Sequence, residues 1–142
     1  MAKSQRPVTI DERYRTLLIL WVGMCFSLVI FWAFIHLMPS VSAPNQKLTL
    51  LLNTAGLIPV ATSFLIKQVM IGKAIENQRV EQVHTANILA WAFCEIAYLL
   101  AFFDNRVTGS SYYYVGFAIA GMGMLLNFPR KQPLLDASQG QF

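Results

Sequence analysis

Apolar residues dominate four long runs of this chain, and the polar residues gather between the runs. The runs cover Thr16–Met38, Leu48–Ile66, Thr85–Phe103 and Tyr112–Phe128. A helix rises about 1.5 Å per residue, so about 20 apolar residues cross a hydrocarbon core about 30 Å thick. The pattern predicts an all-α fold, a bundle of four transmembrane helices that forms a single integral membrane domain over residues 1–142.

Composition agrees with a membrane location. Of the 142 residues, 56% are hydrophobic and 13% are charged, and the mean hydropathy is +0.49. Soluble domains carry about 25% charged residues. The composition therefore excludes a soluble enzyme, a disordered tail and a nucleic-acid-binding module, and the lipid bilayer is the first expected partner.

Local signals indicate where the expected helices begin and end. Thr9 followed by Glu12 forms a capping-box pattern, so the first helix is expected to begin before its apolar run. Pro39 is expected to end that helix, and Pro129 to close the fourth. The Asp-Asn pair at 104–105 and the Gly-Ser-Ser run at 109–111 indicate turns after the third run.

Basic residues predict the orientation of the bundle in the membrane, because cytoplasmic loops carry an excess of Lys and Arg. One side of the expected bundle holds Lys3, Arg6, Arg13, Arg15, Lys67, Lys73, Arg79, Arg130 and Lys131. The other side holds only Lys47 and Arg106. Both termini and the central connection are therefore expected in the cytoplasm, and the expected location is a bacterial cytoplasmic membrane.

The central connection, residues 67–84, has no proline and keeps apolar residues at helical spacing. The second and third helices are therefore expected to extend beyond the membrane as a helical hairpin that turns near residues 76–79. The charges of this segment are interpreted as a solvated face.

Glu95 is the one acidic or basic residue near the middle of a predicted span. A carboxylate is costly there, so we expect Glu95 to be protonated, paired or facing a wet cavity. No basic residue is expected at its depth. Pro59 leaves the carbonyl of Ala55 without its usual donor, and a protonated Glu95 is one group that would supply a hydrogen bond to it.

Four side chains form the hypothetical ion-binding set: Glu95, Tyr98, Thr62 and Ser63. Tyr98 stands one helical turn from Glu95, and the two others are expected at a similar depth on the second span. Ser27, which is central in the first span, is a further possible partner of Glu95 at similar depth.

Small residues indicate where helices approach each other closely. The expected packing positions are Ala90, Cys94 and Ala97 on the third span and Gly116, Ala120 and Gly123 on the fourth. Cys25 and Cys94 lie inside apolar runs without metal-ligand spacing, so no disulfide, metal site or cofactor is expected. His36 and His84 stand alone and are interpreted as polar anchors near the membrane boundaries.

The hairpin over residues 48–103 resembles the proteolipid c-type subunit of rotary ATPases, through a polar turn with Gln78-Arg79, the membrane Glu95 and Tyr98. That resemblance implies that Glu95 binds the transported proton or sodium ion and that Gln78-Arg79 contacts a larger assembly. Two features differ from the family: the glycines cluster on the fourth span, and the carboxylate stands on the third. Small four-helix multidrug exporters are a second resemblance, through size and one membrane glutamate, although theirs is on the first helix.

These observations leave two functions open. In one, the chain is an accessory or structural subunit, or a homo-oligomer, and Glu95 is a protonatable group that hydrogen-bonds between helices. In the other, Glu95 binds a proton or cation during translocation. A membrane enzyme ranks third, because the sequence has no nucleophile and base pair, histidine cluster or phosphate loop.

Overall fold

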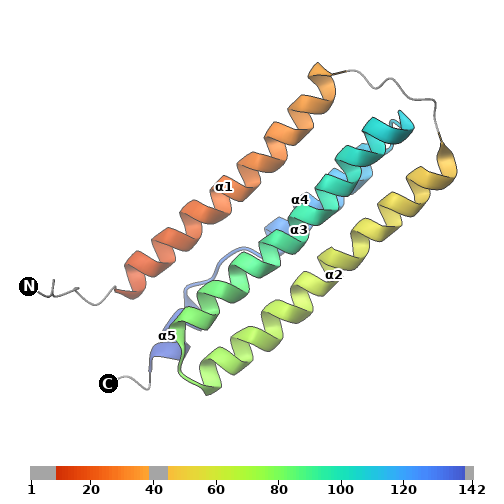
Figure 1. Cartoon of the computed structure of the whole chain (residues 1–142). Helices are drawn as coiled ribbons and strands as arrows, with labels where there is room; N and C mark the ends of the chain where they lie inside the picture. The colour runs from red at the N-terminus through yellow and green to blue at the C-terminus, as the bar shows by residue number, and fades with distance from the viewer. Residues whose placement is uncertain (1–8, 39–44, 140–142) are drawn as a thin grey trace, which may run out of the picture.

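The computed structural model describes residues 9–38 and 45–139. Within that part the chain forms five helices: α1 (Ile10–Leu37), α2 (Gln46–Glu76), α3 (Val80–Thr108), α4 (Tyr113–Leu126) and α5 (Gln132–Ser138). No strand occurs among these residues, which confirms the all-α class. Figure 1 shows α2 and α3 side by side, with α1 along the opposite side of α3 and α4 behind it.

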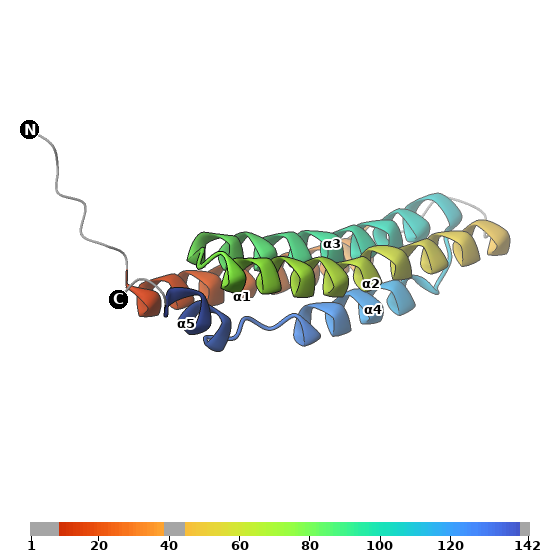
Figure 2. The ribbon, with the colours of Figure 1, turned by 90° about the horizontal axis from the view of Figure 1, so that it is seen from below.

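Three helices are long and apolar enough to cross a membrane, namely α1, α2 and α3. The fourth expected span differs from these three. Its helix, α4, has 14 residues and is therefore only about 21 Å long, which is shorter than a hydrocarbon core of about 30 Å. Figure 2 shows that an irregular segment follows α4 along the bundle and leads into α5.

The start of α1 has the predicted capping box. The Thr9 hydroxyl accepts a hydrogen bond from the Glu12 amide at 3.3 Å, and the Glu12 carboxylate accepts one from the Thr9 amide at 2.8 Å. These bonds satisfy two amides that the first helical turn leaves without partners. Pro39 lies outside the described residues, as do residues 1–8 with Lys3 and Arg6.

The predicted helical hairpin is confirmed, because α2 runs without interruption to Glu76 and α3 begins at Val80. Gln78 takes a positive φ of 53°. The amides of Gln78 and Arg79 donate to the carbonyls of Ile75 and Ala74 at 3.2 and 2.8 Å. This is the pattern of a Schellman motif, which closes a helix with a left-handed residue.

The turn expected at residues 104–105 is not present. Helix α3 continues through Asp104 and Asn105 to Thr108, and it ends at Gly109, whose φ is 60°. Both residues are buried, so their polar side chains serve helix packing and the helix does not stop at them. The turn follows at Gly109. Glycine has no Cβ, so it takes this left-handed conformation with little strain.

Two ion pairs lie at one end of the bundle. Arg13 of α1 lies 3.9 Å from Glu81 of α3, and Lys131, which precedes α5, pairs with Asp11. The Lys131 ammonium lowers the pKa of the exposed Asp11 carboxyl below its ordinary value. The start of α1, the turn between α2 and α3, and α5 therefore lie at the same end (Figure 1).

Helix α3 is the centre of the bundle, and small residues line its contacts. All six positions expected to pack are buried, and so are the neighbouring Ala86 and Ala101. A Cβ added to Gly56 of α2 would lie 3.7 Å from the Ala97 carbonyl oxygen. The small residues at these positions thus allow the helix backbones to approach closely, as is typical of contacts between membrane helices.

Candidate functional site

Glu95 lies in the middle of α3, on the side of that helix that faces α1. Its Oε1 accepts hydrogen bonds from the Tyr98 hydroxyl at 3.0 Å and from the Ser27 hydroxyl at 3.1 Å. The oxygens of Ser27 and Tyr98 are themselves 2.9 Å apart. Ser27 was one of the possible partners that the sequence offered for Glu95, and in the structure it links Glu95 to α1.

The hydrogen-bond donors and acceptors of this cluster suit either protonation state of Glu95. The Ser27 hydroxyl has one proton, and the Met24 carbonyl at 2.7 Å competes with Glu95 for it. With an ionised Glu95, the Ser27 and Tyr98 hydroxyls both donate to the carboxylate. With a protonated Glu95, the acid donates to Ser27, which then donates to the Met24 carbonyl.

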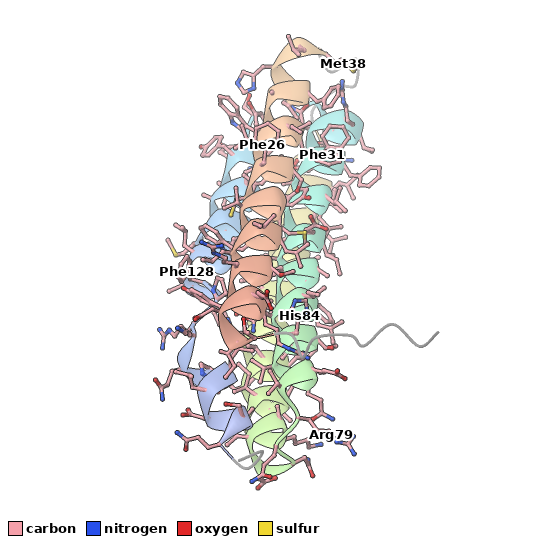
Figure 3. All side chains as sticks on the ribbon, turned by 90° about the vertical axis from the view of Figure 1, so that its left-hand side faces the viewer. Phe26, Phe31, Met38, Arg79, His84 and Phe128 are labelled. Atoms are coloured by element: carbon pink, nitrogen blue, oxygen red, sulfur yellow. The ribbon has the colours of Figure 1, made fainter. Side chains whose placement is uncertain are left out.

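Aromatic rings hold Tyr98 in place. Tyr98 is buried, and its ring centroid lies 5.4 Å from Phe31 of α1 and 6.0 Å from Phe117 of α4. Figure 3 looks onto α1 and shows Phe31 beside α3. Because packing restricts the Tyr98 ring, its hydroxyl reaches Glu95 from a defined direction.

Thr62 and Ser63 do not join this cluster. The Thr62 hydroxyl donates to the Ile58 carbonyl at 2.8 Å, and the Ser63 hydroxyl donates to the Val60 carbonyl at 2.6 Å. Within the described part of the chain, the Glu95 carboxyl is hydrogen-bonded only to Ser27 and Tyr98. The Ala55 carbonyl is therefore not its partner, and of the hypothetical ion-binding set the structure brings together Glu95 and Tyr98.

A second polar cluster surrounds the carboxyl end of α4. Nitrogen donors from three other helices meet its last carbonyls: Trp21 Nε1 lies 3.0 Å from the Met124 oxygen, Trp91 Nε1 lies 3.0 Å from the Asn127 oxygen, and Lys67 Nζ lies 2.9 Å from the Asn127 oxygen. A helix leaves its last four carbonyls without partners, and its carboxyl end attracts a cation.

This second cluster was missed from the sequence. The side-chain nitrogen of Asn127, Nδ2, donates to the Ser63 hydroxyl at 2.9 Å, and the Cys94 thiol lies 3.7 Å from the same hydroxyl. The Lys67 ammonium, the Asn127 side chain, Ser63 and Cys94 thus meet at the carboxyl end of α4. Asn127 and Pro129 directly after an apolar helix were the available signal, since they mark a helix end that needs donors.

A third cluster surrounds Asp104, which is fully buried. Thr108 donates to its Oδ1 at 2.8 Å, and Asn53 of α2 donates to its Oδ2 at 3.0 Å. The Thr49 hydroxyl lies 3.0 Å from that of Thr108. The signal in the sequence was two polar pairs at four-residue spacing, one on each helix of the hairpin, which places each pair on one helix face.

Histidine, cysteine and acidic side chains are scattered over the part of the chain that the structure describes. No group of three or more His, Cys, Asp or Glu side chains gathers there. Cys25 and Cys94 are both free thiols.

Comparison with protein-family models, curated proteins and solved structures found no match to this chain.

Proposed function

We propose that this protein is a small integral membrane protein of structural or accessory type, in which Glu95 fastens α1 to the rest of the bundle. The observation that carries the proposal is that Ser27 of α1 and Tyr98 of α3 share Oε1 of Glu95. Hydrogen bonds between membrane helices contribute about 0.6–2 kcal/mol each and fix the register of the helices.

The weak apolar packing of α1 supports this role. Only Leu17 and Ile35 are buried in α1, and the helix packs on α3 and α4 but not on α2. Polar contacts along its length attach it: the Trp21 indole to Met124, Ser27 to Glu95, and the Arg106 guanidinium to the Met38 carbonyl at 2.8 Å. Removing the central contact is therefore expected to loosen α1.

The outer face of α1 is exposed and apolar, which favours contact with a partner outside the single chain. Its exposed side chains include Ile19 at 72%, Phe26 at 63% and Val22 at 57%. This apolar surface suits lipid tails, a second copy of the chain, or a helix of a larger membrane complex. We propose a homo-oligomer or an accessory place in such a complex, in a bacterial cytoplasmic membrane.

Glu95→Gln and Glu95→Leu together test the structural role. Gln keeps a carbonyl oxygen that accepts both hydroxyl protons, so it should behave as the wild type, whereas Leu removes the acceptor and should destabilise the docked α1 by about 1–2 kcal/mol. The native Cys25 of α1, which is partly buried, reports the change: its reaction with N-ethylmaleimide in detergent should accelerate only in the Leu variant.

Glu81→Leu is the matched control, since Glu81 is an exposed acid on the same helix whose ion pair is long. Exposed ion pairs contribute little, so the reaction of Cys25 should stay as in the wild type. Unchanged Cys25 reactivity in Glu95→Leu would refute the structural role.

Proton or cation translocation through Glu95 is the second candidate. Two observations favour it: Glu95 is only partly buried, and the hydroxyl cluster accommodates both of its protonation states. Here Glu95→Gln separates the two functions, because it keeps the hydrogen bonds but cannot carry a proton. In proteoliposomes, translocation predicts that Glu95→Gln and carbodiimide both abolish ion flux; a wild type that passes no ion above empty vesicles would refute this candidate.

A further inference from the structure

A groove of about 460 Å³ lies between α2 and the segment that joins α4 to α5. Its lining combines two cations with apolar side chains. Lys67 and Phe64 come from α2, Arg130 and Phe128 from the joining segment, Leu126 from the end of α4, and Asn87 from α3. This groove is separate from the Glu95 cluster, which lies between α1 and α3.

The charge in the groove has no counterion among the described residues. No acidic residue lines it, and the ion pairs of the described chain, Arg13–Glu81 and Lys131–Asp11, use neither Lys67 nor Arg130. Lys67 directs its ammonium to the carbonyls of Asn127 and Phe128. An ammonium has three N–H donors, so one donor of Lys67 remains for an anion.

Asn87 adds a polar atom to the groove that has no hydrogen-bond donor among the described residues. The residue is 2% exposed, and its Nδ2 donates to the Val83 carbonyl at 2.8 Å. Its Oδ1 is buried and has no partner in the described part of the chain. A buried acceptor of this kind destabilises the protein unless a donor reaches it, and a hydroxyl in the groove would be such a donor.

The order of these groups along the bundle matches the order of groups in a phospholipid. Helix α2 runs toward the end that carries the ion pairs, so Phe64 lies on the membrane side of Lys67. Leu126 and Phe128 beside it are 63% and 41% exposed, which suits acyl chains. Basic pockets between membrane helices on the cytoplasmic side are typical binding sites for anionic headgroups.

We propose that this groove binds an anionic phospholipid with a hydroxylated headgroup, of the phosphatidylglycerol class. The phosphate lies between Lys67 and Arg130, a headgroup hydroxyl donates to Asn87 Oδ1, and the acyl chains cover Leu126 and Phe128. The site also explains how the irregular segment after α4 is tolerated at membrane depth, because such backbone requires cover by protein, water or polar ligand.

Native mass spectrometry of the purified full chain with added lipids tests the site. Phosphatidylglycerol should bind more tightly than phosphatidic acid, whose headgroup carries no glycerol, and both should bind more tightly than phosphatidylcholine. Arg130→Gln should weaken phosphatidylglycerol binding about fivefold, as expected for the loss of one cation near a membrane surface. Asn87→Ala should remove the preference for phosphatidylglycerol over phosphatidic acid.

Lys73→Gln is the matched control, because Lys73 is an exposed lysine of α2 that does not line the groove. Its affinity for phosphatidylglycerol should equal that of the wild type. Equal binding of phosphatidylcholine and phosphatidylglycerol, or an Arg130→Gln variant of unchanged affinity, would overturn the proposal. Competition by inorganic phosphate at the same concentration as the lipid would identify a free-anion site instead. None of these outcomes depends on the role of Glu95.

Discussion

Two glycines of α4 lie against neighbouring helices at distances that leave no room for a side chain. A Cβ on Gly116 would lie 2.6 Å from the Cβ of Ala101, and one on Gly123 would lie 2.9 Å from Val60 Cγ1. Gly121 on the same helix has no atom within 4 Å of an added Cβ. Within this one helix, therefore, Gly116 and Gly123 lie at close helix contacts, whereas Gly121 lies in open space.

Gly116→Ala should therefore lower the free energy of unfolding, and Gly121→Ala should not. Overpacking a filled contact destabilises by about 1–3 kcal/mol, whereas alanine at an open helical position stabilises by about 0.5–1 kcal/mol relative to glycine. Unfolding by sodium dodecyl sulfate in mixed micelles measures both variants. Equal effects of the two substitutions would show that α4 does not pack on α3 at Gly116.

At the scale of elements, α4 depends on other helices to complete its carboxyl end. The Trp21 indole donates to Met124, and its ring packs edge to face on Phe128 at 5.0 Å. Figure 3 shows Phe128 at the foot of α4. A helix that ends among apolar side chains needs such donors, because its last carbonyls have no partners within the helix.

Trp21→Phe should destabilise the protein by about 1–3 kcal/mol, since a smaller aromatic ring remains but the Met124 carbonyl loses its donor. Trp32→Phe on the same helix is the control: Trp32 is 46% exposed, and the change should have an effect below about 0.5 kcal/mol. Thermal unfolding in detergent compares the two. If both variants lose the same free energy of unfolding, the hydrogen bond from the Trp21 indole does not stabilise α4.

At the scale of the whole molecule, the pair between Asp11 and Lys131 joins α1 to α5 across the charged end. Lys131 lowers the pKa of Asp11 in the folded protein from its ordinary value of 3.8. The ionised form is thus favoured by folding, so the pair contributes fully above the ordinary pKa and is lost as pH falls through the lower folded value.

Acidification through the folded-state pKa of Asp11, which lies below its ordinary value of 3.8, should therefore loosen the contact between α5 and α1. Spin labels at Gln139 and Glu76, which are both exposed, should report a broader distance distribution at that pH than at neutral pH. Asp11→Asn should broaden the distribution at neutral pH and remove its change with pH, whereas Asp136→Asn on α5 should leave the change in place. A persistent pH change in Asp11→Asn would assign it to another group.

At the scale of the whole molecule, the sequence predicts four crossings of the membrane. Because α4 has 14 residues, we propose that α4, the segment after it and α5 together make the last crossing. Single cysteines in a background without Cys25 and Cys94 test this arrangement. A cysteine at Gln78 or Gln139 should react with an impermeant maleimide only from the cytoplasmic side, and one at Ser111 only from the opposite side. Labelling of 78 and 139 from opposite sides would contradict four crossings.

Much of the architecture follows from local sequence. Apolar runs, a capping box at Thr9 and a proline-free connection determine α1 and the α2–α3 hairpin, because each depends on residues within a few turns of one another. Small residues such as Ala97 likewise mark contact faces by helical spacing alone. The burial of Asp104 was not predictable in this way, since an Asp-Asn pair has the same local preference in a turn as at the end of a helix.

What the sequence by itself determined is the helical class, the long apolar helices, the hairpin turn and Glu95 as the exceptional acid. Only the tertiary structure decided the partners of that acid, which are Ser27 and Tyr98 and not Thr62 or Ser63. It also decided that α4 ends early and that Lys67 reaches its last carbonyls. The physical reason is that helix length and periodicity are set by neighbours in sequence, whereas a hydrogen bond between helices depends on which faces meet and at what depth.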